Sequence, residues 1–374
     1  MPVRPLPSKP SLDHLKYQAK DLLKAHAARD RGVAQRLREF HPRFKGAADD
    51  AIFAATLSLT DAQLAIAREY GFKSWARLKA IVESPELVGR LNLPLHERIE
   101  DEAFRRGVEL IDVGDAAGLR QHLKRHPKLV DQQAEFEGEN YFRNPTLLEF
   151  IAENPIRRGS LPKNIAEIAT VIVDAGADRL SMSEALGLIA TGRVPRECGV
   201  QVALIELLCD RGADPDGALE AAATHGEFEA VGALIRRGAV MTLLVAAAMG
   251  RLEDARRLLS HGDDLDRSKA LAIASQFGHE EIVQMLLGAG VDPNGYGGVH
   301  THSTPLHQAA LAGHERAVRL LVEHGASVDM RDLLWRGTAA DWARHSGHAE
   351  IEEYLRELEK ESRKPAKKSD AAKG

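Results

Sequence analysis

Cysteine is nearly absent from this chain: among 374 residues only Cys198 and Cys209 occur. Two cysteines are too few for a disulfide scaffold, so we expect two reduced thiols, as in a cytoplasmic protein. No stretch approaches the ~20 consecutive apolar residues of a membrane-spanning helix, and the first residues lack the apolar segment of a secretory signal. These absences predict a cytoplasmic protein with no membrane partner.

Positive charge and aromatic residues are also in short supply. The formal net charge is −5 at pH 7, so the chain has no overall basic field to attract nucleic acid. Aromatic residues make up 5% of the sequence, whereas alanine and leucine are abundant, a composition that suits closely stacked short helices. We therefore expect a helical protein that does not bind nucleic acid.

Recognisable catalytic motifs are missing too. No nucleophile elbow, phosphate-binding loop, dinucleotide fingerprint or zinc-protease helix occurs where its structural context would require it. We therefore assign no catalytic residue, no metal ligand and no cofactor from the sequence. The absence of these motifs favours a binding protein over an enzyme.

The most informative stretch that is present covers residues 304–330, which open with Thr-Pro-Leu-His-Gln-Ala-Ala. Thr304 is suited to cap a helix, and Pro305 suits the first helical position, where no N–H is needed. Gly313 would end this helix, and a second, amphipathic helix would end at Gly325. Since one helix pair cannot bury its own apolar face, the pattern should repeat.

The pattern does repeat along the chain. Thr338 opens a similar motif 34 residues later, and Lys269 opens a related one 35 residues earlier. With its T-P-L-H-x-A-A and Gly-His signatures and a period near 33 residues, the sequence resembles the ankyrin-repeat family. The resemblance implies an all-α solenoid of about eight helix pairs with short β-hairpin fingers. It also implies a concave groove in which a protein or peptide partner docks.

The remaining sequence is organised around these repeats. We expect a flexible leader, a helical N-terminal cap domain, the ankyrin-repeat solenoid and a disordered basic tail, at residues 1–10, 11–100, 101–358 and 359–374 respectively. Helices of the cap domain should begin after Ser11, Asp61 and Ser74. Residues 61–75 are similar to a helical leader of bacterial ankyrin-repeat proteins, and we interpret the cap domain as a polar cover for the solenoid.

Some repeats depart from the common length. Extra residues are expected near 154–163 in the second repeat and near 193–200 in the third. The repeats that start at Gly217 and Met241 are short, with almost no room for a finger. These short repeats would leave a gap in the wall of the groove.

Candidate binding residues gather in three loops between repeats, the first, second and third fingers, at residues 131–145, 294–303 and 331–336. Exposed aromatic and arginine side chains carry most interface energy. The candidates are Phe136, Tyr141 and Arg143 in the first finger, Tyr296, His300 and His302 in the second, and Trp335 and Arg336 in the third. Two alternatives concern packing: Phe136 and Phe142 could fasten the first finger to the core, and Trp335 could pack on Tyr296.

Three further candidates, Glu149, His307 and Asp341, occupy the position of the consensus histidine at the start of an inner helix. They would form an acid–base set if the solenoid curled tightly enough to bring its ends together. His300, His302 and His307 could similarly hold a metal ion. The family resemblance implies instead that His307 hydrogen-bonds within its own loop.

Two functional hypotheses follow. The first is an interaction module that binds a protein or peptide partner in the concave groove. The alternative is a small-molecule-binding or enzymatic protein that uses a groove pocket with the histidine cluster, Glu149 and Asp341. The sequence leaves the partner and the oligomeric state open.

Overall fold

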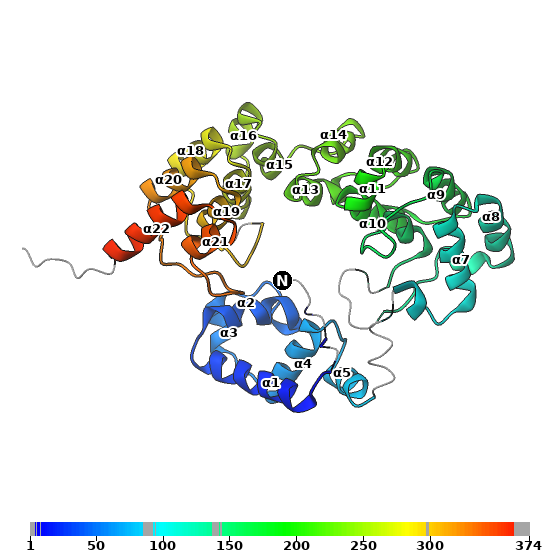
Figure 1. The fold of residues 1–374 in the computed structure, drawn as a ribbon, viewed down its shortest axis with the longest axis horizontal. Helices are drawn as coiled ribbons and strands as arrows, with labels where there is room; N and C mark the ends of the chain where they lie inside the picture. Colours follow the sequence, from blue (N-terminus) through cyan, green and yellow to red (C-terminus); the bar gives the residue numbers. More distant parts are fainter. Residues whose placement is uncertain are drawn as a thin grey trace, which may run out of the picture. The chain divides into compact units, whose positions relative to one another are not determined.

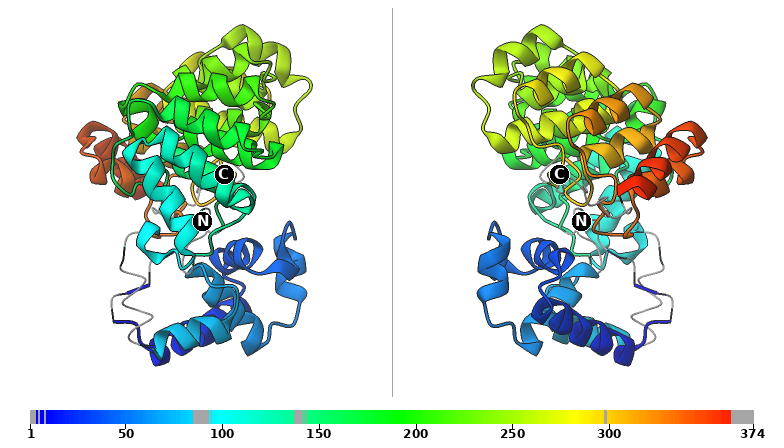
Figure 2. Two further views of the ribbon diagram at one scale, coloured as in Figure 1. Left: turned by 90° about the vertical axis from the view of Figure 1, so that its right-hand side faces the viewer. Right: turned by 90° about the vertical axis from the view of Figure 1, so that its left-hand side faces the viewer.

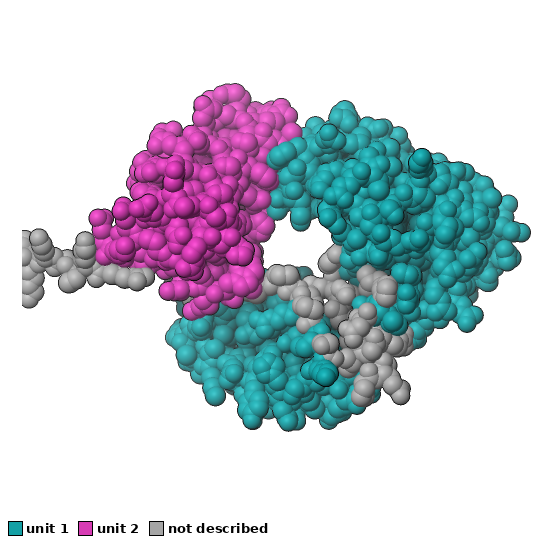
Figure 3. All heavy atoms as spheres, in the orientation of Figure 1, with its two compact units in different colours: residues 1–240 teal, residues 241–374 magenta. Residues whose placement is uncertain are grey.

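The computed structural model describes residues 4, 6–7, 9–84, 93, 95–136, 142, 144–296 and 299–362. The chain forms two compact units, residues 1–240 and 241–374, which are described separately (Figure 3). The boundary between the units falls within the repeats, whereas the change of architecture expected near residue 100 lies inside unit 1. In the described ranges, no helix is both long and apolar enough to cross a membrane.

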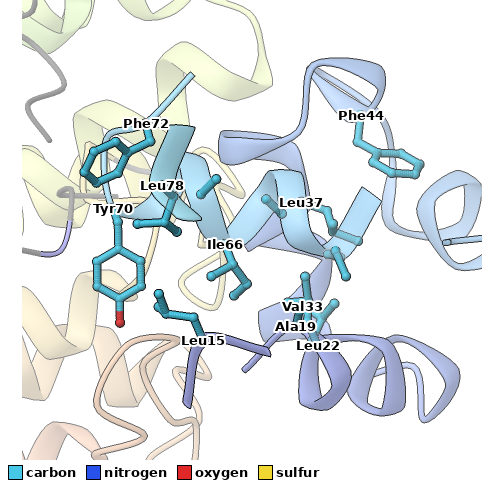
Figure 4. Close-up of a cluster of buried hydrophobic side chains, with 14 of the residues drawn as sticks. Leu15, Ala19, Leu22, Val33, Leu37, Phe44, Ile66, Tyr70, Phe72 and Leu78 are labelled. Atoms are coloured by element: carbon cyan, nitrogen blue, oxygen red, sulfur yellow. The ribbon is translucent and has the colours of Figure 1, made fainter. Parts of the chain in front are cut away.

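Unit 1 begins with a small group of helices (Figure 1). They are α1 (Leu12–Ala27), α2 (Arg31–Phe40), η1 (Pro42–Phe44), α3 (Asp49–Ala54), α4 (Leu59–Glu69) and α5 (Trp75–Val82). Their apolar faces meet in one core around Leu22, Leu37 and Ile66, which are fully buried (Figure 4). Arg36 links α2 to α4 through two hydrogen bonds to the buried carboxylate of Glu69, at 2.7 and 2.9 Å.

The starts of these helices confirm two of the three expected caps. The Ser11 and Ser74 hydroxyls accept hydrogen bonds from the first turns of α1 and α5. The expected cap at Asp61 is wrong, because α4 begins two residues earlier and Ser58 is its N-cap. Asp61 is the third helical residue: its amide donates to the Ser58 hydroxyl, and its carboxylate accepts a hydrogen bond from the Ser58 amide, forming a capping box.

The rest of unit 1 consists of helix pairs with short 3₁₀ segments. The 3₁₀ segments η2 (Leu95–Arg98) and η3 (Pro127–Val130) flank the first pair, α7 (Glu102–Val113) and α8 (Ala116–Arg125). The next pairs are η4 (Leu147–Ala152) with α9 (Ile165–Asp174), α10 (Arg179–Ala190) with α12 (Gln201–Asp210), and α13 (Asp216–Thr224) with α14 (Phe228–Arg236). The extra residues of the third repeat form α11 (Arg193–Glu197), near the expected insertion.

Unit 2 continues with further helix pairs, coloured yellow-green to red in Figure 2. They are α15 (Leu243–Ala248) with α16 (Leu252–Leu259), α17 (Asp264–Phe277) with α18 (Glu280–Gly288), α19 (Pro305–Ala312) with α20 (Glu315–Glu323), and α21 (Ala339–His345) with α22 (Ala349–Ser362). The first helices of the pairs pack on one another in chain order. The expected core residues Leu243, Leu244 and Leu286 are buried. The described residues thus contain eight helix pairs, and the all-α solenoid is confirmed.

Histidines tie successive pairs of unit 2 together. The imidazoles of His279, His314 and His348 each donate a hydrogen bond to a backbone carbonyl of the preceding pair, at 2.9–3.1 Å. Glycine is required beneath them: Gly278 has a left-handed φ of +71°, and a Cβ there would lie 2.5 Å from Nδ1 of His314. The Gly-His signature therefore connects each repeat to the preceding one through a hydrogen bond and close packing.

The fingers differ from the expected β-hairpins. Within the described residues, the only ladder contact is a single antiparallel bridge between Gln133 and Thr146. In the third finger the backbone amides of Leu334, Trp335 and Gly337 point to the side chain of Asp332. A side-chain acceptor thereby replaces the cross-strand partner that a hairpin would provide.

The end of the solenoid also lies later than expected. Helix α22 continues to Ser362, four residues beyond the expected boundary at 358. The reason is Glu359, which is buried, accepts a hydrogen bond from the Thr338 hydroxyl at 2.7 Å and pairs with Arg356 at 2.9 Å. The rest of the expected basic tail, residues 363–374, lies outside the described residues.

Candidate functional site: a groove in the C-terminal repeats

Unit 2 has a groove of about 1100 Å³ on the face formed by its inner helices and fingers. The ends of α17 and α19, helix α21 and the second and third fingers line it. The lining includes five of the residues expected from the sequence, namely His300, His302, Trp335, Arg336 and Asp341. We take this groove as the candidate site of unit 2.

An aromatic wall stands on one side of the groove. Trp335 is 69% exposed, and its ring meets His302 edge-on at a centroid distance of 5.4 Å. Trp335 also packs on the buried ring of Trp342 at 5.7 Å. Tyr296, the neighbour considered for Trp335 from the sequence, donates its hydroxyl hydrogen to the Arg331 carbonyl at 2.6 Å. The wall therefore presents a large apolar surface that is already held in place.

Asp332 holds the third finger in shape. This fully buried carboxylate accepts hydrogen bonds from the amides of Leu334, Trp335 and Gly337 and from the Trp342 indole, at 2.6–3.1 Å. Burial alone would raise the pKa of Asp332, but these hydrogen bonds outweigh it and lower the pKa below its usual value. The carboxylate stays ionised and fixes the position of Trp335.

Positive side chains border the aromatic wall. Arg336 is exposed and adopts a left-handed φ of +60°, and Arg344 is exposed on α21. The carboxylate among the described lining residues, Asp341, already accepts hydrogen bonds from Arg356 at 2.6 Å and Arg344 at 3.4 Å. Arginines therefore outnumber carboxylates in the described lining of the groove, whereas the formal net charge of the chain is negative.

The histidine cluster is divided between two roles. His300 lines the groove and hydrogen-bonds Gln276 at 2.9 Å. His307 is 1% exposed: Nδ1 accepts from Thr304, and Nε2 donates to the Gly337 carbonyl. Burial lowers the pKa of His307. Both ring nitrogens of His307 are thus hydrogen-bonded to the loop around it, as the family resemblance implied. His307 is therefore a structural residue and not a groove residue. Among the described residues, no group of three His, Cys, Asp or Glu side chains could hold a metal ion.

Glu149, expected to face a groove, is instead buried in unit 1. Its carboxylate accepts hydrogen bonds from the amide (2.7 Å) and hydroxyl (3.2 Å) of Thr146 in a capping box. Burial raises its pKa to about 7, and the negative charge of Glu184 adds to the effect. Glu149, His307 and Asp341 each cap their own helix, so their local contacts account for them without an acid–base set.

The first finger corrects a further expectation. Phe136 is 2% exposed and stacks on Phe142, whose ring meets the core residue Phe150 at 5.3 Å. Phe136 is therefore a packing residue that fastens the finger and not a binding residue. Tyr141 and Arg143 lie outside the described residues.

Several groove residues were missed by the sequence analysis. Gln276, Leu311 and His345 each stand two positions before the glycine that ends an inner helix, and all three line the groove. Phe277 and Arg344 lie beside them. The regular spacing of these positions from the turn glycines was the signal available in the sequence.

The architecture belongs to the class of α-solenoids built from stacked helix pairs. A model of ankyrin repeats in three copies matches residues 219–296 and 271–366. Cyclin-dependent kinase 4 inhibitor B of Homo sapiens is 34% identical over 118 residues, which are 30% of this chain and 84% of that protein. This chain belongs to the ankyrin-repeat family.

Two longer relatives match smaller shares of their own length. Ankyrin repeat and KH domain-containing protein mask-1 of Caenorhabditis elegans is 30% identical over 206 residues, covering 50% of this chain and 8% of that protein. Probable E3 ubiquitin-protein ligase XBOS32 of Oryza sativa subsp. japonica is 37% identical over 116 residues, covering 29% of this chain and 23% of that protein. Ankyrin repeats are in general protein-interaction modules.

Proposed function

We propose that this chain is an interaction protein that receives a segment of a protein partner in the groove of unit 2. The observation that carries the proposal is Trp335, a large ring left 69% exposed on a finger that a buried carboxylate holds rigid. An aromatic side chain fixed before binding loses little entropy when a partner covers it, so it contributes strongly to affinity.

The relatives support the same kind of function. The kinase inhibitors are named for their action on another protein, and this chain covers 84% or more of the bovine and human sequences. The exposed Cys198 and the half-buried Cys209 are both free thiols. We propose a reducing compartment such as the cytoplasm for this interaction, and the two free thiols support that proposal.

The test is a selection of displayed random peptides on the full-length protein, followed by binding measurements with each selected peptide by fluorescence anisotropy. Trp335→Ala should weaken these peptides at least about tenfold, as expected for a central aromatic contact. The matched control is Leu265→Ala, which removes an exposed apolar side chain of unit 2 that does not line the groove. Peptides that bind both variants like the unaltered protein would exclude the groove as the binding site.

A further inference from the structure

We propose that the groove of unit 2 selects an acidic segment that carries an aromatic or long aliphatic residue between its carboxylates. This inference rests on the proposed function and adds the chemistry of the partner. It follows from the charge of the groove, the backbone of Arg336 and the apolar surface beside it.

The charge of the groove is opposite in sign to that of the chain. The protein as a whole carries −5, whereas the groove presents the guanidinium groups of Arg336 and Arg344. Its carboxylate Asp341 is paired with Arg356 at 2.6 Å and, at a longer distance of 3.4 Å, with Arg344, so the arginines outnumber it. Arginine forms two parallel hydrogen bonds with a carboxylate, which suits glutamate and aspartate side chains.

The backbone of Arg336 is a second, independent observation. Its φ of +60° lies in the left-handed region, where glycine or asparagine is favoured and a long side chain causes strain. The Arg336 carbonyl accepts a hydrogen bond from the Arg331 guanidinium at 2.6 Å, so this loop conformation is held from both sides of Arg336. Glycine would fit this position with less strain, yet the position carries a cation that lines the groove.

The apolar surface defines the second element of the partner. Trp335 and His302 form one wall, and Phe277 and Leu311 line the groove as well. An aromatic or long aliphatic side chain would bury apolar area against these four residues. Carboxylates on both sides of that side chain could then reach Arg336 and Arg344.

A nucleic acid is a weaker candidate for the same groove. Single-stranded nucleic acid could stack a base on Trp335, but such proteins follow the backbone with an extended basic groove. Here the described lining offers two arginines and the imidazoles of His300, His302 and His345. The acidic peptide needs only two charge contacts and one apolar contact, which the groove provides.

The experiment extends the peptide selection to charge variants of the full chain. Peptides selected on the unaltered protein should be enriched in Asp and Glu around one aromatic or aliphatic residue. Arg336→Gln and Arg344→Gln should each weaken them up to about fivefold, the range of exposed ion pairs, and the double variant Arg336→Glu with Arg344→Glu should weaken them more than either. Arg316→Glu, an exposed site on α20 outside the groove, is the matched control and should leave affinity unchanged.

Each outcome distinguishes the two proposals. Peptides that require Trp335 but show no acidic enrichment and no effect of the arginine variants would overturn this inference and leave the proposed function standing. Peptides that ignore Trp335 would overturn both. Tighter, Trp335-dependent binding of oligothymidylate would assign the groove to nucleic acid, and a dimer dissociated by Trp335→Ala would assign it to a second copy of the chain. Acidic peptides weakened by both arginine variants and not by Arg316→Glu would support the inference.

Discussion

The first and third fingers use aromatic residues in opposite ways. In unit 1, Phe136 and Phe142 stack on each other and reach the core at Phe150. In unit 2, Trp335 points outward, while Asp332 organises the finger through hydrogen bonds. Both fingers precede a helix whose N-cap residue is a threonine. The position of an aromatic residue in a finger therefore does not decide whether its side chain is buried or exposed.

The two fingers differ in the interaction that holds their backbone in place. A loop with its own buried acceptor is rigid without help from its aromatic residue, so that residue stays available for a partner. In the described part of the first finger, Phe136 and Phe142 are buried, and this apolar burial contributes stability. Substitutions in each finger should separate these two cases.

The largest effect is expected from Phe142→Ala. Removing this buried ring leaves a cavity between Phe136 and Phe150 and should lower the stability of the surrounding repeats by about 3–5 kcal/mol. Hydrogen exchange of α7 and η4 in the full-length protein would measure the loss. Trp335→Ala, the matched substitution in the other finger, should change the exchange of α19 and α21 by less than about 1 kcal/mol. Equal losses in the two fingers would contradict the comparison.

Asp332→Ala should have the next largest effect. It leaves three backbone amides and the Trp342 indole without their acceptor, which should cost about 3 kcal/mol. Since the pKa of Asp332 is lowered in the folded protein, its contribution is present above the unfolded pKa near 3.8 and is lost as the pH falls. Denaturation can be followed by tryptophan fluorescence in a Trp75→Phe background, where Trp335 and Trp342 report on unit 2. Asp332→Asn, which keeps one oxygen acceptor, should lose less, and an Ala variant as stable as the parent would refute the role assigned to this carboxylate.

The acids that follow the two fingers should respond to pH in opposite directions. The pKa of Glu149 is raised from 4.5 to about 7 in the folded protein, so its contribution to stability is present below pH 4.5 and is lost as the pH rises through 7. Between pH 5 and pH 8 the loss should be about 2–3 kcal/mol. The pKa of Asp341 is lowered, because the hydrogen bonds from Thr338 and Arg356 outweigh burial, so Asp341 stabilises at neutral pH.

The measurement for Glu149 compares unfolding free energies at pH 5 and pH 8. Glu149→Gln should remove the loss at high pH, since an amide keeps an oxygen acceptor for Thr146 and carries no charge. Glu229→Gln, an exposed site on α14, is the control and should behave as the unaltered protein does. An equal pH dependence in the Glu149 variant and the unaltered protein would show that another group is responsible.

Part of this structure could be predicted from the sequence, and part could not. The helix pairs, the Gly-His connections and the core leucines follow from local capping and from apolar spacing, so they were predictable. The extended N-cap at Ser58 was missed because Asp61, three residues later, is also a good cap, and only the backbone conformation decides between them. The orientation of Phe136 was left open because Phe136 stacks on Phe142, which in turn packs on the core residue Phe150.

Only some of the residues that line the groove could be predicted from the sequence. His300, His302, Trp335, Arg336 and Asp341 were selected as unusual residues in fingers and helix starts, and they line one groove. Gln276, Leu311 and His345 were missed because each is ordinary alone, and only the stacking of three helices brings them to one face. The role of Asp332 was missed because its partners are backbone amides, which a sequence does not distinguish.

The smallest change in stability is expected from Arg336→Gly. This variant tests whether a groove residue of the third finger can be removed without the loss of stability expected for Phe142 in the first finger. Glycine relieves the left-handed strain, worth about 1–2 kcal/mol, but adds about 0.5–1 kcal/mol of chain entropy to the unfolded state. The two terms nearly cancel, so the variant should be as stable as the parent or up to about 1 kcal/mol more stable. Its affinity for acidic peptides should nevertheless fall, because a groove cation is gone. Denaturation and peptide binding on the same preparation would measure both. A variant that is clearly destabilised would show that Arg336 supports the finger as Phe142 does, and the contrast between the two fingers would then lose its basis.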